Sequence, residues 1–323
     1  NMDSIDGLDV STIVLPATVR TLYCNSNNLE TLAFVSGSES LANIYAANNQ
    51  ISDLTPLSKF SLNIIHLAAN NITDLSPLNI EAISDLDVST NSITDISCLQ
   101  GIPAYQLDLG YNQISDISAL ADNYRIGMVD LNNNQITDIS ALKECFKIYS
   151  LDISFNQITD ISAVATIDAM QHFKARGNQI IDISPLASCT KFIESGNIVD
   201  LRDNQITSVD ALAKFTKSSH IYLSNNQITD VSPLQYCVAL EMLKLNNNQV
   251  TDASALRTLP NLYILELVGN PVASATGLGL AGHNNSLMGN SVLRITYNEG
   301  IDFEAMSKVE KLVVTVYDVN HRQ

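Results

Sequence analysis

The sequence predicts an α/β solenoid, in which one short unit is repeated along the chain and each unit adds a single strand to a parallel sheet. Two observations lead to this prediction. The motif L-x-L-x-x-N-x-I recurs, nearly always at intervals of 21 or 22 residues, and a fixed period in this range is typical of solenoids. Its apolar positions also alternate with polar ones, as in a strand with one buried face. The motif asparagines are Asn27, Asn49, Asn70, Asn91, Asn112, Asn134, Asn156, Asn178, Asn204, Asn226, Asn248 and Asn270.

The ends of the chain are less regular than its middle. We expect residues 1–20 to form a degenerate N-terminal cap turn and residues 21–276 to form an array of about twelve units. The interval from Asn178 to Asn204 is the exception and carries four extra residues around positions 194–197.

Each unit is predicted to begin with a short strand. Val129 and Leu131 should face the core, while Met128, Asp130 and Asn132 should face away from it. The asparagine that follows is expected to end the strand in a sharp turn, where its amide can bond backbone groups that the turn leaves unpaired. Repeated on every unit, these amides should form a structural ladder.

The segment after each ladder asparagine reads ITDIS followed by Ala or Pro and then Leu. We interpret its Ser or Thr as the N-cap of a short helix or helical turn, because proline at the first helical position gives up only an amide that would be unpaired anyway. An aspartate just before each cap lies near the positive helix end and is assigned a structural role. The clearest caps are Thr55-Pro56, Ser76-Pro77, Ser184-Pro185 and Ser232-Pro233, and the aspartates are Asp53, Asp74, Asp95, Asp116, Asp138, Asp160, Asp182, Asp230 and Asp252.

Beyond Asn270 the pattern loosens over residues 277–290, returns at Leu293 and Ile295, and finishes in a β-prone run at residues 312–319. We expect residues 277–323 to form irregular C-terminal repeats or a cap that closes the exposed edge of the core. The beginning of another domain is the alternative.

The NQITDIS segments resemble the repeats of the internalin family of bacterial surface proteins, whose units read N-x-I-x-D-I-x-P-L. The resemblance covers about residues 20–270. It implies a right-handed leucine-rich-repeat superhelix with a parallel β-sheet on the concave face and short helical, 3₁₀ or extended segments on the convex face. It also implies recognition of a host-cell receptor by the concave face. The convex segments KECFKIYS and VATIDAMQHF depart from the family consensus, so a shared partner is not implied.

Charge and hydropathy argue against several classes of partner. The chain has 34 acidic and 17 basic residues, a formal charge of -17, which repels phosphate backbones and anionic headgroups, so we expect no nucleic-acid partner. No apolar run approaches the roughly 18 to 20 residues that a membrane span needs. Residues 277–282 match G-x-G-x-x-G, but they lack a surrounding βαβ unit, so we expect a loop or cap there and no cofactor.

No catalytic or metal site is expected. The histidines of the array (His66, His172 and His220) fall on strands far apart, and His283 and His321 lie outside the regular repeats. The cysteines have no metal-ligand spacing. Cys145, Cys189 and Cys237 belong to non-adjacent repeats, and two steps along a stack of rungs roughly 4.8 Å apart exceed the Cα separation that a disulfide tolerates. We therefore expect buried free thiols at these three positions and at Cys24, and a more exposed one at Cys98.

The concave face is expected to carry two outward columns of side chains. The middle column runs Tyr23, Tyr45, His66, Asp87, Asp108, Asp130, Asp152, Lys174, Asp200, Tyr222, Lys244, Glu266 and Arg294, and the second column becomes apolar as Ile198, His220, Met242, Ile264 and Val292. Asp87, Asp108, Asp130 and Asp152 form an acidic stripe that should attract a cationic segment or, weakly, a divalent cation. The residues expected to bind a partner are Tyr23, Tyr45, His66, the acidic stripe, Lys174, Ile198, His220, Tyr222, Met242, Lys244 and Ile264.

These features favour non-catalytic recognition of a protein or glycoprotein ligand by the concave face. The resemblance places such a protein on a bacterial cell surface or outside the cell, in adhesion. The alternative is a cytoplasmic adaptor resembling the leucine-rich regulatory subunit of protein phosphatase 1, which the reduced core cysteines would suit.

Overall fold

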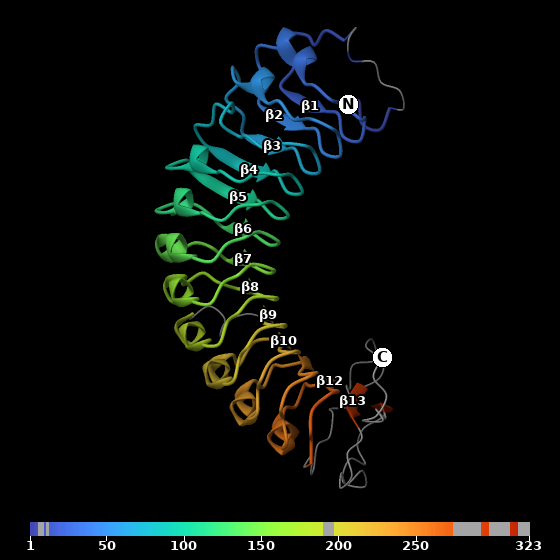
Figure 1. Ribbon diagram of the computed structural model, residues 1–323, viewed down its shortest axis with the longest axis vertical. Helices are drawn as coiled ribbons and strands as arrows, with labels where there is room; N and C mark the ends of the chain where they lie inside the picture. The colour runs from blue at the N-terminus through green and yellow to red at the C-terminus, as the bar shows by residue number, and fades with distance from the viewer. Residues whose placement is uncertain (6–9, 11–12, 190–196, 274–291, 297–310, 316–323) are drawn as a thin grey trace. The chain divides into compact units, whose positions relative to one another are not determined.

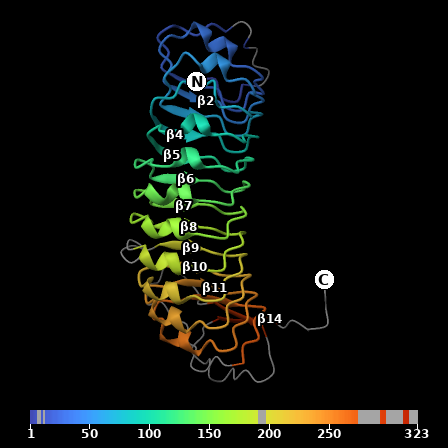
Figure 2. The same ribbon diagram turned by 60° about the vertical axis from the view of Figure 1, so that its left-hand side comes forward.

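The computed structural model describes residues 1–5, 10, 13–189, 197–273, 292–296 and 311–315. They belong to two compact units, Asn1–Ile158 and Thr159–Gln323. Within each unit the strands line the inner side and short 3₁₀ helices line the outer side (Figure 1). Figure 2 shows the rungs of each unit stacked one on the next.

In both units the strands follow one another in chain order and pair in parallel with their neighbours. The strands of the first unit are β1 (Thr21–Tyr23), β2 (Asn43–Tyr45), β3 (Ile64–His66), β4 (Ile83–Asp87), β5 (Ala104–Asp108), β6 (Met128–Asp130) and β7 (Ser150–Asp152). The strands of the second unit are β8 (His172–Lys174), β9 (Ile198–Asp200), β10 (His220–Tyr222), β11 (Met242–Lys244), β12 (Ile264–Leu267), β13 (Val292–Thr296) and β14 (Lys311–Thr315). The predicted solenoid with a parallel sheet is confirmed.

The predicted alternation is also confirmed. Val129 and Leu131 are 3% and 0% exposed, whereas Met128, Asp130 and Asn132 are only half-buried. Leucine, isoleucine and valine at the equivalent positions of the other rungs form the core. Each rung therefore buries one apolar face and presents the other to solvent.

The ladder asparagines hold successive rungs together. The Asn134 Nδ2 donates to the carbonyl of Leu109 on the preceding rung at 3.0 Å and to that of Leu131 on its own rung at 3.1 Å. Its Oδ1 accepts the amide of Ile114 at 2.9 Å. The same bonds recur at Asn112 and Asn226. Buried amides thus satisfy the backbone groups that the turns leave open, as expected.

The outer segments are 3₁₀ helices. In the first unit they are η2 (Ala33–Gly37), η3 (Thr55–Leu57), η4 (Ser97–Leu99), η5 (Ser118–Leu120) and η6 (Ser140–Glu144). In the second unit they are η7 (Ser162–Thr166), η8 (Ser184–Ser188), η10 (Asp210–Lys214), η11 (Ser232–Tyr236) and η12 (Ser254–Thr258).

The prediction that Ser or Thr is the N-cap is wrong. Ser232 is the first residue of η11, and Ser76-Pro77 forms only a turn. The capping oxygen comes from the aspartate two residues earlier, whose Oδ1 accepts the Ser or Thr amide at 2.7–2.8 Å on all nine units that carry it. The structural role of these aspartates is therefore a direct hydrogen bond.

The ends of the array are partly described. Met2 and Ser4 donate their amides to the carbonyls of Tyr23 and Asn25, so the first residues extend the backbone ladder by one turn. At the other end β13 and β14 add two more parallel rungs. Outside the described residues lie the glycine-rich run at 277–282, His283, His321, the extra residues at positions 194–196, and positions 316–319.

Candidate functional site

The middle column is confirmed in the sheet register of each unit. In the first unit Tyr23 pairs with Tyr45, and the pairing continues through His66 and the acidic stripe to Asp152. In the second unit it runs from Lys174 through Asp200, Tyr222, Lys244 and Glu266 to Arg294. Because neighbouring parallel strands lie about 4.8 Å apart, consecutive members of a column are in contact range.

The first unit begins with an aromatic cluster. The rings of Tyr23 and Tyr45 stack with centroids 4.5 Å apart, and His66 meets Tyr45 edge-on at 4.8 Å. The His66 Nε2 lies 2.8 Å from Oδ2 of Asp85. Burial, followed by the neighbouring Tyr23, raises the pKa of Tyr45. The cluster presents a rigid aromatic surface with one polar edge.

The acidic stripe has a structural function that the sequence pattern did not reveal. In each of its members Oδ1 accepts the amide two residues later, as in Asp108 with Gly110 at 3.1 Å and Asp152 with Ser154 at 3.0 Å. Burial, then the charge of Asp130, raises the pKa of Asp108 to about 6. Within the described residues no cluster of His, Cys, Asp and Glu is arranged to hold a metal ion, so the structure gives no support to a divalent cation here.

In the second unit the two acidic side chains of the middle column, Asp200 and Glu266, are paired with basic side chains. Arg202 binds Asp200 through Nε at 2.8 Å and Nη2 at 2.5 Å. Glu266 accepts from Arg294 Nη1 at 2.6 Å and lies 3.7 Å from Lys244 Nζ. Asp200 and Glu266 keep their predicted outward positions in the register, but each is only 6% exposed because an arginine side chain pairs with it.

Tyr222 lies between two of these cations. The Arg202 guanidinium is 5.3 Å from its ring centroid and the Lys244 ammonium is 5.7 Å away, within the range of cation–π attraction. The second outward column passes beside it, and its register through Ile198, His220 and Met242 is as predicted. These side chains are half-buried rather than freely exposed, since neighbours on adjacent rungs cover one another.

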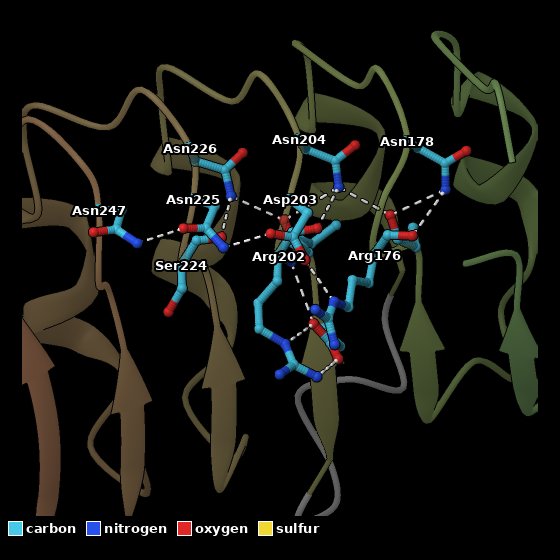
Figure 3. Close-up of polar contacts among 12 residues, drawn as sticks. Arg176, Asn178, Arg202, Asp203, Asn204, Ser224, Asn225, Asn226 and Asn247 are labelled. Atoms are coloured by element: carbon cyan, nitrogen blue, oxygen red, sulfur yellow. Dashed lines mark hydrogen bonds and ion pairs between the residues drawn. The ribbon is translucent and has the colours of Figure 1, made fainter. Parts of the chain in front are cut away.

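A polar edge lies where the strands of the second unit end (Figure 3). Arg176 Nε donates to Asp203 Oδ2 at 2.5 Å, Asn225 Nδ2 donates to Asp203 Oδ1, and Asn247 Nδ2 donates to Asn225 Oδ1 at 2.6 Å. Asp203, Asn225 and Asn247 have positive φ, at 55–60°, which Asn and Asp tolerate best among residues with a side chain. The sequence analysis missed this chain, although the Asn-Asn pairs at 225–226 and 247–248 signal it.

Two partial catalytic pairs occur, one in each unit. His66 has a carboxylate partner in Asp85, and the Ser219 Oγ lies 2.8 Å from His220 Nδ1. Among the described contacts His66 has no nucleophile and His220 has no carboxylate. Neither pair completes the arrangement that nucleophilic catalysis uses.

The five cysteines are free thiols, four of them buried, as expected. Burial raises the pKa of Cys24, Cys189 and Cys237 to about 12 and that of Cys98 and Cys145 to about 11. They are therefore protonated at neutral pH and poor nucleophiles.

Comparison with known proteins identifies the repeat. A family model described as leucine-rich repeats in two copies matches residues 219–258, and one described as a leucine-rich repeat matches residues 144–165. No curated protein sequence gave a significant match.

Solved structures extend this similarity over most of the chain. The internalin InlF of Listeria monocytogenes is 27% identical, with a TM-score of 0.66 over 86% of this chain and 88% of its own. The functional domain of InlJ from Listeria monocytogenes is 19% identical, with a TM-score of 0.71 over 94% of this chain and 65% of its own. The ectodomain of an Arabidopsis thaliana membrane receptor kinase, in complex with Casparian strip integrity factor 2, is 19% identical, with a TM-score of 0.64 over 92% and 42%.

No helix within the described residues is long and apolar enough to cross a membrane. The asparagine ladder, the parallel rungs, the 3₁₀ segments and the matched repeats lead to one conclusion. The chain is an internalin-like leucine-rich-repeat protein.

Proposed function

We propose that the chain is a non-catalytic recognition protein whose sheet face binds a protein or glycoprotein ligand. The observation that carries this proposal is the outward column of each unit, which places aromatic and charged side chains on a rigid sheet at regular spacing. Aromatic and arginine side chains of this kind supply most of the energy of protein interfaces. The similarity to InlF and to a receptor ectodomain solved with its ligand supports the same function.

The proposed contact residues form two groups. In the first unit they are Tyr23, Tyr45, His66 and the acidic stripe, and in the second they are Lys174, Ile198, His220, Tyr222, Met242, Lys244 and Ile264. Tyr222 is the central anchor of the second group because Arg202 and Lys244 already fix its ring, so little side-chain entropy remains to be lost on binding.

The location we propose is a bacterial cell surface or the extracellular space, with a role in adhesion. This follows from the similarity to internalins. The five free thiols favour a second candidate, a cytoplasmic adaptor, because thiols persist in reducing compartments. Cell fractionation followed by protease treatment of intact cells distinguishes the two, since only a surface protein is cleaved in intact cells.

The experiment that tests recognition is capture of a partner from host or cellular extracts, identification of that partner, and titration with the purified proteins. Tyr222→Ala combined with Met242→Ala should weaken binding by about 2 kcal/mol or more and leave the thermal midpoint nearly unchanged. Tyr236→Ala with Val238→Ala is the matched control, because both are exposed and lie at or beside η11 on the outer side. Equal losses of affinity in the two pairs, or a large fall in thermal midpoint for the first, would remove the sheet face from the proposal.

A further inference from the structure

Tyr105, Gly127 and Tyr149 occupy equivalent positions on three consecutive rungs of the first unit, at the edge where β5, β6 and β7 begin (Figure 1). Backbone hydrogen bonds join the three residues. The Gly127 amide donates to the Tyr105 carbonyl at 2.9 Å, and the Tyr149 amide donates to the Gly127 carbonyl at 2.8 Å. Because parallel rungs lie about 4.8 Å apart, the two tyrosines are separated by a single rung, and that rung has no side chain at this position.

The two tyrosine rings close over Gly127. A Cβ placed on Gly127 would lie 2.9 Å from Cε2 of Tyr105 and 2.9 Å from Cε1 of Tyr149. Both atoms are ring carbons next to the carbon that bears the hydroxyl. Since they approach the same point, they are no more than twice this distance apart. Unlike Gly101 and Gly269, Gly127 does not have a positive φ, so the rings rather than the backbone require glycine here.

The pair is also joined at its hydroxyl groups and is open to solvent on one side. Burial, then a hydrogen bond with the Tyr105 hydroxyl, raises the pKa of Tyr149, as expected for a bond in which Tyr149 keeps its proton and donates it. Tyr105 is 53% exposed, whereas Tyr149 is half-buried. An exposed phenol is therefore hydrogen-bonded to a less exposed one, and a hydrogen atom can pass between them.

These features meet the requirements of dityrosine formation. In that reaction each phenol loses one hydrogen atom, which is one electron and one proton, and the two radicals join through ring carbons next to their oxygens. The hydrogen on each joined carbon then moves to the neighbouring oxygen, which restores the aromatic rings. The exposed Tyr105 can be oxidised first, take the hydroxyl hydrogen of Tyr149, and be oxidised again. One hydrogen peroxide accepts both hydrogen atoms through a haem peroxidase and is reduced to two water molecules.

We infer that Tyr105 and Tyr149 are an oxidative cross-linking site, at which a peroxide and a peroxidase join β5 to β7 through a dityrosine bond. The fold favours this pair because it holds both rings together on one chain, where proximity replaces a bimolecular encounter. The bond closes a loop that contains the whole rung of β6, so it should brace that rung against local unfolding. The inference is independent of the proposed recognition of a ligand, since neither tyrosine is a proposed contact residue.

The stacked pair of Tyr23 and Tyr45 provides an internal comparison. Their ring centroids are 4.5 Å apart and their planes differ by 11°, so their ring carbons lie face to face. The bond in dityrosine joins two rings edge to edge, and Tyr45 is also packed against His66. We therefore expect Tyr23 and Tyr45 to cross-link less than Tyr105 and Tyr149, although they are on adjacent rungs.

The first test treats dilute protein with hydrogen peroxide and a haem peroxidase. Monomer is isolated by size-exclusion chromatography, which removes cross-links between molecules, and is digested for mass spectrometry. The main cross-linked product should join the peptides that contain Tyr105 and Tyr149, with a mass two hydrogen atoms below the sum of the two peptides. A monomer without this product, or one joined mainly between Tyr23 and Tyr45, overturns the inference.

Single phenylalanine substitutions identify the residues that react. Tyr105→Phe and Tyr149→Phe each keep the ring and remove the hydroxyl, so each should lower the dityrosine fluorescence of the monomer at least tenfold. The matched controls are Tyr124→Phe and Tyr236→Phe, at residues that are 62% and 56% exposed, and they should keep the wild-type yield. Equal yields in all four variants would show that exposure rather than pairing decides the reaction, and would overturn the inference.

Gly127→Ala tests the geometry with both tyrosines present. Its methyl group would take the space between the two ring carbons and push them apart, so the yield should fall several-fold. The control is Gly110→Ala at the edge where the strands end, where a Cβ would lie equally close, 2.9 Å, to Nδ2 of Asn132. The control should cross-link as the wild type does, and thermal midpoints establish that both variants are folded. An unchanged yield in Gly127→Ala, or equal losses in both variants, overturns the inference.

Hydrogen exchange tests the bracing of the rung. In the cross-linked monomer the backbone amides of β6 should exchange at least tenfold more slowly than in untreated protein, because the bond limits opening of the segment between its ends. Peroxidase-treated Tyr105→Phe is the control for other oxidation, and it should exchange at the rate of the untreated variant. Equal exchange in cross-linked and untreated wild type would overturn the bracing role.

Discussion

At the scale of single residues, aspartate does two things in this fold. One carboxylate oxygen accepts the amide two residues later, both where strands end and where 3₁₀ helices begin. The charge that remains depends on location. It is fully solvated at Asp116 and crowded by like charges at Asp108. The sequence pattern shows where the aspartates are. It does not show whether a given aspartate serves mainly as an acceptor for a backbone amide or as a surface charge.

Asp108→Asn should therefore stabilise the protein at pH 7.5, by about 1 kcal/mol. The variant keeps the acceptor for the Gly110 amide and removes a half-buried charge that is repelled by Asp130, Asp87 and Asp152. Urea denaturation at pH 7.5 measures the difference. The control is Asp116→Asn, because hydrogen bonds from Ser118 lower the pKa of Asp116, so neutralising it should lower stability instead.

The same carboxyl predicts a pH dependence with a definite sign. Its pKa is about 6 in the folded protein against about 3.9 in an unfolded chain. Between these values the folded state holds more protons, so the contribution of Asp108 to the free energy of unfolding rises as pH falls from about 6 to about 4. The gap between wild type and Asp108→Asn should narrow over this interval. A gap that stays constant would contradict the raised pKa.

The buried thiols make a third residue-scale prediction. Cys24, Cys145, Cys189 and Cys237 are inaccessible, and Cys98 is only half-buried. Alkylation of the native protein at pH 8 should modify Cys98 first and the other four only on the timescale of unfolding. Mass spectrometry of timed samples gives the order, and all five should react quickly in denaturant. Rapid modification of Cys145 in the native state would show that its rung opens locally.

At the scale of elements, the repeat period was sufficient to place the strands, because the alternation of Val129 and Leu131 with polar neighbours is local. The start of the 3₁₀ helix was misassigned because Ser140 and Asp138 are both good capping residues, and only geometry shows which oxygen reaches the amide. Before η10 the capping aspartate is replaced by Ser208, whose hydroxyl oxygen accepts a hydrogen bond from the backbone amide of Asp210 at 3.1 Å. The exposure of side chains was harder to predict than the position of the strands. Arg202, for example, lies two residues after Asp200 and covers its carboxylate.

The turn after β12 carries a prediction about close packing. Gly269 has φ +76°, and an added Cβ would overlap Oδ1 of Asn247. This side-chain amide cannot move without disturbing the hydrogen bond that its Nδ2 donates to Oδ1 of Asn225. Gly101 has a similar φ of +72° but nothing within 4 Å. Gly101→Ala should therefore cost about 1 kcal/mol of backbone strain, and Gly269→Ala about 2 kcal/mol more.

Thermal denaturation of the two glycine variants gives this comparison. Asn247→Gly removes the overlapping side chain and suits the positive φ, so adding it should recover part of the loss in Gly269→Ala. Equal destabilisation by the two alanine substitutions would show that Asn247 is displaced at no cost.

At the scale of the whole molecule, the candidate site was only partly predictable. The repeat alone gave the residues of the middle column and their order. The sheet register of each unit pairs them as expected, for example Asp87 with Asp108 and Tyr222 with Lys244. The pairing of Tyr105 with Tyr149 was not predicted, because they are 44 positions apart and meet only where Gly127 leaves space between them. Which charged side chains pair within each unit also depends on how far a long side chain extends, and the repeat period gives no information about this.

The last prediction concerns the kinetics of partner binding and follows from the separate charge balance of the units. Residues 1–158 carry 18 acidic and five basic residues, so the acidic stripe of this unit should speed the approach of a cationic partner. The paired charges around Glu266 and Arg294 should produce little long-range field. Asp108→Asn with Asp130→Asn should slow association several-fold at about 50 mM salt and flatten its salt dependence. Tyr222→Ala should leave association unchanged and speed dissociation by about tenfold. Surface plasmon resonance with the captured partner at low and high salt measures both rate constants, with Asp116→Asn and Asp138→Asn as the control. An equal loss of salt dependence in that control would assign steering to net charge rather than to the acidic stripe.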